Sequence, residues 1–226
     1  VVANEKVNLD IYKGEILALL GENGSGKTTL MNMIYGIYYP DEGHIFVNGK
    51  EVTIRSPKDS YELGIGMVHQ HFKLVDVLTA AENIVLGLPG GAVLNRKELE
   101  RKVAELAGKY GFEIDPAKKI YNMSVSEKQT VEILKVLYRG ADILILDEPT
   151  RGIDVGTKVD IQKLVLKLAG EGMSVTFISS ETDEMLRTCS RLIVMRDRRV
   201  VGELSGEDLT QTKIMSTIAG GESKHE

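Results

Sequence analysis

Cysteine and long apolar runs are both scarce in this chain of 226 residues. Its single cysteine, Cys189, excludes a disulfide framework and a metal site built on several cysteines, and it favours a cytosolic compartment. No apolar stretch approaches the roughly 20 residues that a membrane-spanning helix needs. The longest stretch, at residues 143–146, is instead typical of a buried parallel strand.

Positive charge is also in short supply. The 28 basic residues are outnumbered by 33 acidic residues, and the net charge of −5 argues against a general nucleic-acid binder. Two short basic clusters, at residues 96–102 and 196–199, are interrupted by acids, and we interpret both as solvated faces. The chain starts at Val1 without an initiator methionine, so we expect that an N-terminal piece is missing.

Residues 21–28 read GENGSGKT, a complete GxxxxGK[ST] phosphate-binding pattern. Its glycines let the backbone form a nest whose N–H groups point at phosphates, and the following helix adds positive potential. Lys27 is expected to reach the β- and γ-phosphates, and the Thr28 hydroxyl is expected to bind Mg²⁺. The residues assigned here to nucleotide binding are Gly21, Asn23, Gly24, Ser25, Gly26, Lys27, Thr28 and Thr29.

The residues around this loop predict a strand before it and a helix after it. Residues 15–20 form a short apolar run with strand character. The helix is expected to continue to about Tyr38, because Pro40 and Gly43 then stop it.

Two further segments predict β structure near the N-terminus. Residues 7–11 alternate apolar and polar side chains, as a half-exposed strand does. Residues 44–54, with Asn48-Gly49 at their centre, predict a β-hairpin with a type I′ turn and therefore an antiparallel sheet.

Between about residues 73 and 139 the pattern becomes helical. Asn95 is placed to cap one helix, and residues 130–138 carry a second apolar stripe. Beyond this block, strands and helices alternate. The expected strands lie at 143–147, 174–179, 192–195 and 200–204, and the expected helices at 158–169, from 183 and at 209–219.

This order of elements indicates an α/β fold. We expect a P-loop NTPase core with a mainly parallel sheet, an N-terminal antiparallel β subdomain and an inserted helical subdomain at about 73–139. Residues 1–220 are expected to form a single domain, and residues 221–226 a disordered polar tail.

Two acids, Asp147 and Glu148, directly follow the apolar run at residues 143–146. A buried strand would deliver both carboxylates to the C-terminal edge of the sheet, where ligands bind in open α/β folds. We expect Asp147 to hold Mg²⁺ through a water molecule, and Glu148 to polarise the water that attacks the γ-phosphate. An Asp-Glu pair at a strand end also serves as a turn or helix cap, and the intact phosphate loop favours the nucleotide.

Three more segments carry a family resemblance. Residues 68–70 resemble a Q-loop, residues 124–129 a signature motif, and residues 147–154 a Walker B motif with its D-loop. In that order and spacing, and over essentially the whole chain, the sequence is similar to the nucleotide-binding domain of ABC transporters.

The resemblance implies an ATP and Mg²⁺ site shared between two subunits. It implies that Gln70 contacts Mg²⁺ and the γ-phosphate and couples them to a membrane permease. It also implies that Ser124 and Ser126, together with Asp154, act on the nucleotide held by a second nucleotide-binding domain, identical or not. The chain would then lie in the cytoplasm, peripheral to the inner face of the cell membrane, and no nucleic-acid partner is expected. The residues alone leave plainer alternatives open, namely a loop residue for Gln70 and a helix N-cap for Ser124.

Residues 64–72 and 131–142 narrow the resemblance to ATPases of simple-sugar and nucleoside importers, which usually carry two nucleotide-binding domains in one polypeptide. Up to Thr150 the chain is similar to the first domain of such tandem proteins, and from Arg151 onward to the second. We therefore expect a fusion of two half-domains, natural or engineered. An uninterrupted family member is the alternative.

The switch position departs from the family pattern. Ser180 stands where a histidine usually contacts the γ-phosphate, and a hydroxyl cannot carry the imidazole's proton or charge. His69 and His71 flank Gln70 and do not match that position, so we interpret both as structural loop residues.

The signature segment and the adenine-stacking position also depart from the family pattern. Val125 and Ser126 stand where Gly-Gly is usual, and the Cβ of Ser126 is expected to obstruct close approach to a partner's phosphate. The aromatic side chain that usually stacks on adenine would lie just upstream of Val1.

Three functions remain. The first is an ATPase subunit that drives sugar or nucleoside import through a permease. The second is an ATP-binding dimerisation or regulatory module with little or no turnover. The third, a soluble ATPase acting on nucleic acid or ribosomes, is disfavoured by the single domain and the acidic balance. We favour the first, with hydrolysis weaker than in an intact family member.

Overall fold

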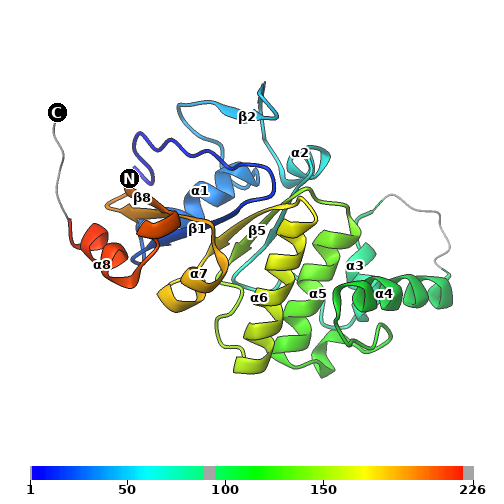
Figure 1. Cartoon of the computed structure of the whole chain (residues 1–226). Helices are drawn as coiled ribbons and strands as arrows, with labels where there is room; N and C mark the ends of the chain where they lie inside the picture. The colour runs from blue at the N-terminus through cyan, green and yellow to red at the C-terminus, as the bar shows by residue number, and fades with distance from the viewer. Residues whose placement is uncertain (1, 89–94, 221–226) are drawn as a thin grey trace.

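A six-stranded sheet forms the centre of the computed structural model, which describes residues 2–88 and 95–220 (Figure 1). Neighbouring strands pair in parallel from one edge as far as the fifth strand, and the sixth is antiparallel to it. In order across the sheet the strands are β4 (Ile65–Val68), β5 (Ile143–Asp147), β6 (Ser174–Ile178), β1 (Ile16–Gly21), β7 (Arg191–Arg196) and β8 (Arg199–Ser205). The predicted mainly parallel sheet is confirmed.

Both faces of this sheet are covered, which explains the unbroken apolar runs of its strands. Leu144 and Leu146 of β5 pack with helices α5 (Val125–Tyr138) and α6 (Val155–Gly170) on one face. Ile145, between them, packs with Met31 of helix α1 (Lys27–Ile34) on the other face. Because β5, β6, β1 and β7 pair in parallel, their C-terminal ends lie at the same edge of the sheet.

The predicted helical block forms its own hydrophobic cluster beside the sheet. Helices α3 (Ala80–Val85) and α4 (Arg96–Tyr110) pack against α5, and a short 3-10 helix, η1 (Ile120–Asn122), joins them. The predicted cap is confirmed, because Asn95 Oδ1 accepts a hydrogen bond from the Glu98 N–H at 3.4 Å.

The predicted hairpin is also confirmed. Strands β2 (Ile45–Val47) and β3 (Lys50–Val52) pair antiparallel as a separate two-stranded sheet. Asn48 and Gly49 both adopt positive φ angles, 52° and 74°, as a type I′ turn requires. Helix α2 (Pro57–Glu62) follows, and Ser56 caps it.

Two local predictions are wrong. Residues 7–11 form no strand, although Val7, Leu9 and Ile11 do pack on the core. Alternation reports burial, and within residues 2–88 and 95–220 no strand pairs with this segment. Helix α1 ends at Ile34, four residues early. Gly36 has a φ of 81°, and a Cβ there would lie 2.5 Å from the Ser56 carbonyl oxygen, so the crossing of two chain segments ends this helix.

The C-terminal helices agree with the sequence pattern. Helix α7 (Thr182–Thr188) follows β6, and helix α8 (Gln211–Ala219) follows the 3-10 turn η2 (Gly206–Asp208). Among the described residues, no helix combines the length and the apolarity needed to cross a membrane. The predicted tail at 221–226 lies outside the described residues.

Candidate nucleotide site

The phosphate-loop pattern lies between the end of β1 and the start of α1, as predicted. Gly26 precedes the helix with a φ of 97°, and a Cβ there would lie 2.4 Å from the Asn4 side chain. A Cβ on Gly21 would lie 2.2 Å from the carbonyl oxygen of Met195 in the neighbouring strand β7. The loop therefore needs glycine at both ends for packing reasons, besides any contact with a ligand.

Lys27 extends into the centre of its own loop. Its ammonium donates hydrogen bonds to the carbonyl oxygens of Gly21 at 2.7 Å and Glu22 at 3.0 Å, and to Ser25 Oγ at 3.3 Å. Burial lowers the pKa of Lys27, and the nearby carboxylates of Glu148 and Asp147 oppose that shift. The arrangement holds one cation, desolvated, among oxygen acceptors.

The two acids at the end of β5 have different environments. Asp147 is buried and accepts a hydrogen bond from the Thr28 hydroxyl at 3.3 Å. Burial raises the pKa of Asp147, the Thr28 hydrogen bond lowers it, and the charge of Glu148 raises it further. Glu148 adopts a left-handed backbone with a φ of 52°, and its N–H donates to the Ile178 carbonyl oxygen at 2.9 Å. A non-glycine residue in this conformation is strained, which is common at functional sites.

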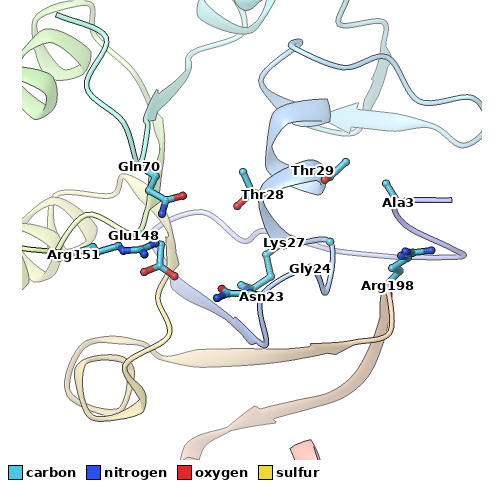
Figure 2. A pocket seen from close by; sticks show the side chains of 11 residues that line it. Ala3, Asn23, Gly24, Lys27, Thr28, Thr29, Gln70, Glu148, Arg151 and Arg198 are labelled. Carbon is cyan, nitrogen blue, oxygen red and sulfur yellow. The ribbon is translucent and has the colours of Figure 1, made fainter. Parts of the chain in front are cut away.

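A cavity of about 290 Å³ joins the loop, Gln70 and Glu148 (Figure 2). Figure 2 shows Gln70, Glu148 and Arg151 on one side of the loop, and Ala3 and Arg198 on the other. Of the residues predicted from the sequence, Asn23, Gly24, Gly26, Lys27, Thr28, Thr29, Gln70 and Glu148 line it. Asp147 is hydrogen-bonded to the lining residue Thr28, and Ser25 accepts a hydrogen bond from Lys27. Gly21 packs against the neighbouring strand β7.

Three lining residues were missed by the sequence analysis: Ala3, Arg151 and Arg198. Arg198 belongs to a cluster that we interpreted as a solvated face, and its side chain is indeed exposed, but it borders the cavity. No local signal marks Arg198, because the pairing of β7 with β1 brings the turn after β7 close to the phosphate loop from the opposite end of the chain.

The signature segment lies outside the residues that line this cavity. Ser124 caps α5, since its Oγ accepts from the Glu127 N–H at 3.2 Å and its own N–H donates to Glu127 Oε2 at 2.7 Å. This is the plainer alternative that the sequence left open, a helix N-cap.

Ser126, two residues further on, ties the signature helix to the D-loop. Its hydroxyl donates to Asp154 Oδ2 at 2.7 Å. Asp154 also caps α6 by accepting from the Thr157 N–H at 3.0 Å and hydroxyl at 2.9 Å. The hydrogen bond from Ser126 and those from Thr157 lower the pKa of Asp154 to about 2. The side chains of Ser126 and Asp154 thus have hydrogen-bond partners within the chain.

Ser180 follows β6 and is exposed, outside the residues that line the cavity. Its neighbour Ser179 is buried and donates to Glu184 Oε2 at 3.3 Å. The same carboxylate oxygen accepts from the Thr150 hydroxyl at 2.6 Å, and Lys158 lies 3.2 Å from the other oxygen. A buried polar network therefore fixes the backbone on which Ser180 stands.

The two histidines beside Gln70 differ in burial. The His69 ring packs edge-on against Tyr35 with centroids 5.4 Å apart. Burial, followed by the charges of Lys73 and Lys135, lowers the pKa of His69 to about 4, so the ring is neutral near pH 7. His71 is exposed. The geometry of His69 supports a packing role.

Comparison with known proteins shows which family the chain resembles. A family model described as ABC transporter matches residues 4–151. The nucleoside import ATP-binding protein NupA of Lactococcus lactis is 44% identical over 97% of the chain, and the ribose import ATP-binding protein RbsA of Caldanaerobacter subterraneus is 36% identical over 97%. The chain spans only 44% and 45% of the length of these two relatives.

Solved structures give the same picture of the fold. A nucleotide-free ATP-binding cassette from an ABC transporter superposes with a TM-score of 0.82 at 27% identity, over 95% of this chain and 89% of the other. The dimeric post-hydrolysis state of the cassette MJ0796, bound to ADP and Pi, superposes with a TM-score of 0.78 at 29% identity, over 90% of each chain.

Proposed function

Because the chain belongs to the ABC transporter family, we propose that it is an ATP-binding and ATP-hydrolysing subunit of an importer for nucleosides or sugars. One observation carries the proposal: a buried lysine, a hydroxyl–carboxylate pair and a second carboxylate converge on a single cavity at the end of the sheet. The names of the relatives support the class of solute.

Binding would begin at the phosphate loop. The Lys27 ammonium would exchange its hydrogen bonds to the loop carbonyls for hydrogen bonds to the β- and γ-phosphates. Because the loop already holds this cation at its centre, little rearrangement of the side chain would be needed. The backbone N–H groups of the nest and the N-terminus of α1 would add to the same attraction.

The residues that would hold a magnesium ion are Thr28, Gln70 and Asp147. The Thr28 hydroxyl and an Asp147 oxygen lie 3.3 Å apart, and such hard oxygen ligands suit Mg²⁺. Within residues 2–88 and 95–220, no group of three or more His, Cys, Asp or Glu side chains could form a complete metal cage. A bound ion would take its remaining ligands from phosphate and water, and it would neutralise phosphate charge.

Hydrolysis would depend on Glu148. Glu148 and Lys27 line the same cavity, which supports a role for the Glu148 carboxylate in accepting a proton from an attacking water. Gln70, on the same side of the loop in Figure 2, would contact the γ-phosphate end of the nucleotide. Ser180 would contribute a hydrogen bond and no charge.

A second nucleotide-binding domain would complete the site. Ser124, Ser126 and Asp154 would face the nucleotide bound by that partner, and ATP would join the two domains. Phosphate between two anion sites favours the closed pair, because it binds that state more tightly. We place the chain at the cytoplasmic face of the membrane, held there by permease subunits.

We also propose that residues 1–220 form one domain, with the helical block at 73–139 inserted in it and a fusion of two half-domains meeting at Thr150. Strands from both sides of that position interleave, because β1 lies between β6 and β7. The buried hydrogen bond from the Thr150 hydroxyl to Glu184 also crosses the proposed junction. Both parts would therefore fold as a unit.

The test is ATP hydrolysis measured at increasing protein concentration. The rate per subunit should rise with concentration, since each composite site needs two subunits, and Lys27→Ala should stay at background throughout. Lys213→Ala, which removes an exposed lysine on α8, is the matched control and should behave as the wild type. A wild-type rate per subunit that stays at background over the whole range would favour the binding module with little turnover.

The importer assignment has its own test. When the chain is expressed in its source organism and purified from solubilised membranes in the presence of ATP, it should copurify with a permease. Copurification with RNA or DNA in place of a permease would contradict the proposal.

A further inference from the structure

The cavity has two chemically different ends, and their order fixes the direction in which a nucleotide would lie. Gln70 and Glu148, which act on the terminal phosphate under the proposed function, occupy one end. The phosphate loop occupies the middle, and Ala3 and Arg198 occupy the opposite end (Figure 2). A nucleotide with its last phosphate at Glu148 therefore has its base beside Arg198.

Arg198 is held at this position by an unusual backbone. It is one of two consecutive non-glycine residues with positive φ, 50° at Asp197 and 68° at Arg198, in the tight turn between β7 and β8. Glycine is the residue that adopts this conformation without strain. The Glu5 N–H donates to the Arg198 carbonyl oxygen at 3.0 Å, which fastens the turn to the N-terminal segment beside Ala3.

The neighbouring arginines bind other groups of the protein, whereas Arg198 differs from them. Arg196 donates to the Ile218 carbonyl oxygen at 2.7 Å, and Arg199 pairs with Glu5 at 2.7 Å. The Arg198 guanidinium has no hydrogen-bond or ion-pair partner among residues 2–88 and 95–220, and it borders a second cavity of about 270 Å³ as well. It is an exposed cation with a rigid, planar head next to a nucleotide-sized space.

We propose that Arg198 is a base-binding residue, whose guanidinium stacks on the nucleobase of the bound nucleotide. A guanidinium stacks on aromatic rings and attracts their π face. None of the described residues that line the cavity is aromatic, so Arg198 is the planar group at that end that can perform this contact. The contact needs a base as well as phosphates, and it rests on the proposed function, since its ligand is the same nucleotide.

The test compares ADP with inorganic pyrophosphate, each with Mg²⁺, by calorimetric titration of the full chain. The two ligands share the diphosphate and differ by adenosine. Arg198→Gly should weaken ADP binding by about two- to fivefold, the effect of one exposed cation–π contact, and leave pyrophosphate affinity unchanged. Its melting temperature should equal or exceed that of the wild type, because glycine relieves the strained φ, so a lost affinity would not report unfolding.

Two matched variants complete the design. Arg198→Lys retains the charge and the strained backbone but not the planar head, and its ADP affinity should fall between the wild type and Arg198→Gly. Arg187→Ala removes an exposed arginine on α7 and should change neither ligand. Equal weakening of ADP and pyrophosphate by Arg198→Gly would make Arg198 a phosphate contact and overturn the proposal, as would unchanged ADP affinity. A wild type that binds neither ligand would overturn the proposed function and this inference with it.

Discussion

The phosphate loop and the signature segment both start a helix with polar residues, yet their surroundings differ. The loop brings Lys27 and Thr28 against acids more than 100 residues away, in a cavity lined from five separate parts of the chain. At the signature segment Ser124 is exposed and Ser126 is half-buried, and their partners are Glu127 in a local capping box and Asp154.

This difference shows what one chain can supply. The loop finds its chemistry inside the molecule, because carboxylates and a lysine converge there at the cost of burial and backbone strain. The signature segment contains a helix start closed by its own capping box, and its residues are not among those that line the cavity. Under the proposed function, the ligand of this helix start would be the nucleotide bound by a second subunit.

Replacing Glu148 by Gln tests the loop side of this comparison and should have the largest effect. The amide keeps the shape and the strained backbone of Glu148 but cannot accept a proton, so turnover should fall by about 10²–10⁴-fold. ATP affinity should stay within about threefold, because less than one hydrogen bond's worth of binding is lost. Single-turnover hydrolysis and equilibrium ATP binding measure the two quantities.

A matched variant is Glu207→Gln, an exposed acid in η2, which should leave both quantities unchanged. If Glu148→Gln retained near wild-type turnover, another group would be the base, and the convergence at the loop would not be catalytic.

Replacing Ser126 by Gly tests the signature side and should have a smaller effect in the opposite direction. Removing the Cβ opens the approach to a partner's phosphate, and relief of about 1 kcal/mol of crowding corresponds to about a fivefold rise in turnover at high protein concentration. Loss of the Ser126 hydroxyl should also raise the pKa of Asp154 from about 2, since that hydrogen bond is the main cause of the low value. Concentration-dependent ATPase assays and an NMR titration of the aspartate carboxyls report these changes.

Ser126→Ala separates the two causes, because it removes the hydroxyl and keeps the Cβ. The pKa of Asp154 should rise as in the glycine variant, while turnover should stay near that of the wild type. Equal turnover in both variants would refute steric obstruction at this position.

Sequence reasoning succeeded where the determining contacts are local. The phosphate loop, the hairpin turn at Asn48-Gly49 and the Asn95 cap depend on residues a few positions apart, and the run at 143–146 reports burial on both faces directly. It placed Asp147 and Glu148 correctly at the strand end for the same reason.

It failed where the cause lies far along the chain. Helix α1 stops because Gly36 meets Ser56, 20 residues later, and Arg198 reaches the cavity because β7 pairs with β1. The segment at 7–11, predicted as a strand, has the correct burial pattern, but no strand in the described part of the chain pairs with it. Local patterns register which face of a segment is buried, whereas crossings and sheet neighbours depend on topology.

The pH dependence of stability tests whether His69, next to the loop region, is a packing residue, and we expect the smallest change here. His69 adjoins Gln70, yet it packs on Tyr35, and its pKa is about 4 in the fold against about 6.5 when unfolded. Between these values the unfolded chain binds the proton more readily, so the free energy of unfolding must decrease as the pH falls from 6.5 towards 4. Since the ring is only partly buried, the loss at pH 5 should be on the order of 1 kcal/mol.

Urea unfolding at pH 7 and pH 5 measures this loss in the wild type and in His69→Phe. The phenyl ring preserves the edge-on contact with Tyr35 and cannot bind a proton, so the variant should lose less stability over this interval than the wild type does. An equal loss in both proteins would mean that His69 does not titrate as a buried group. ATP turnover at pH 7 should be little changed in the variant, because a packing residue affects the site only through the position of Gln70. A large loss of turnover without loss of stability would show that His69 takes part in catalysis.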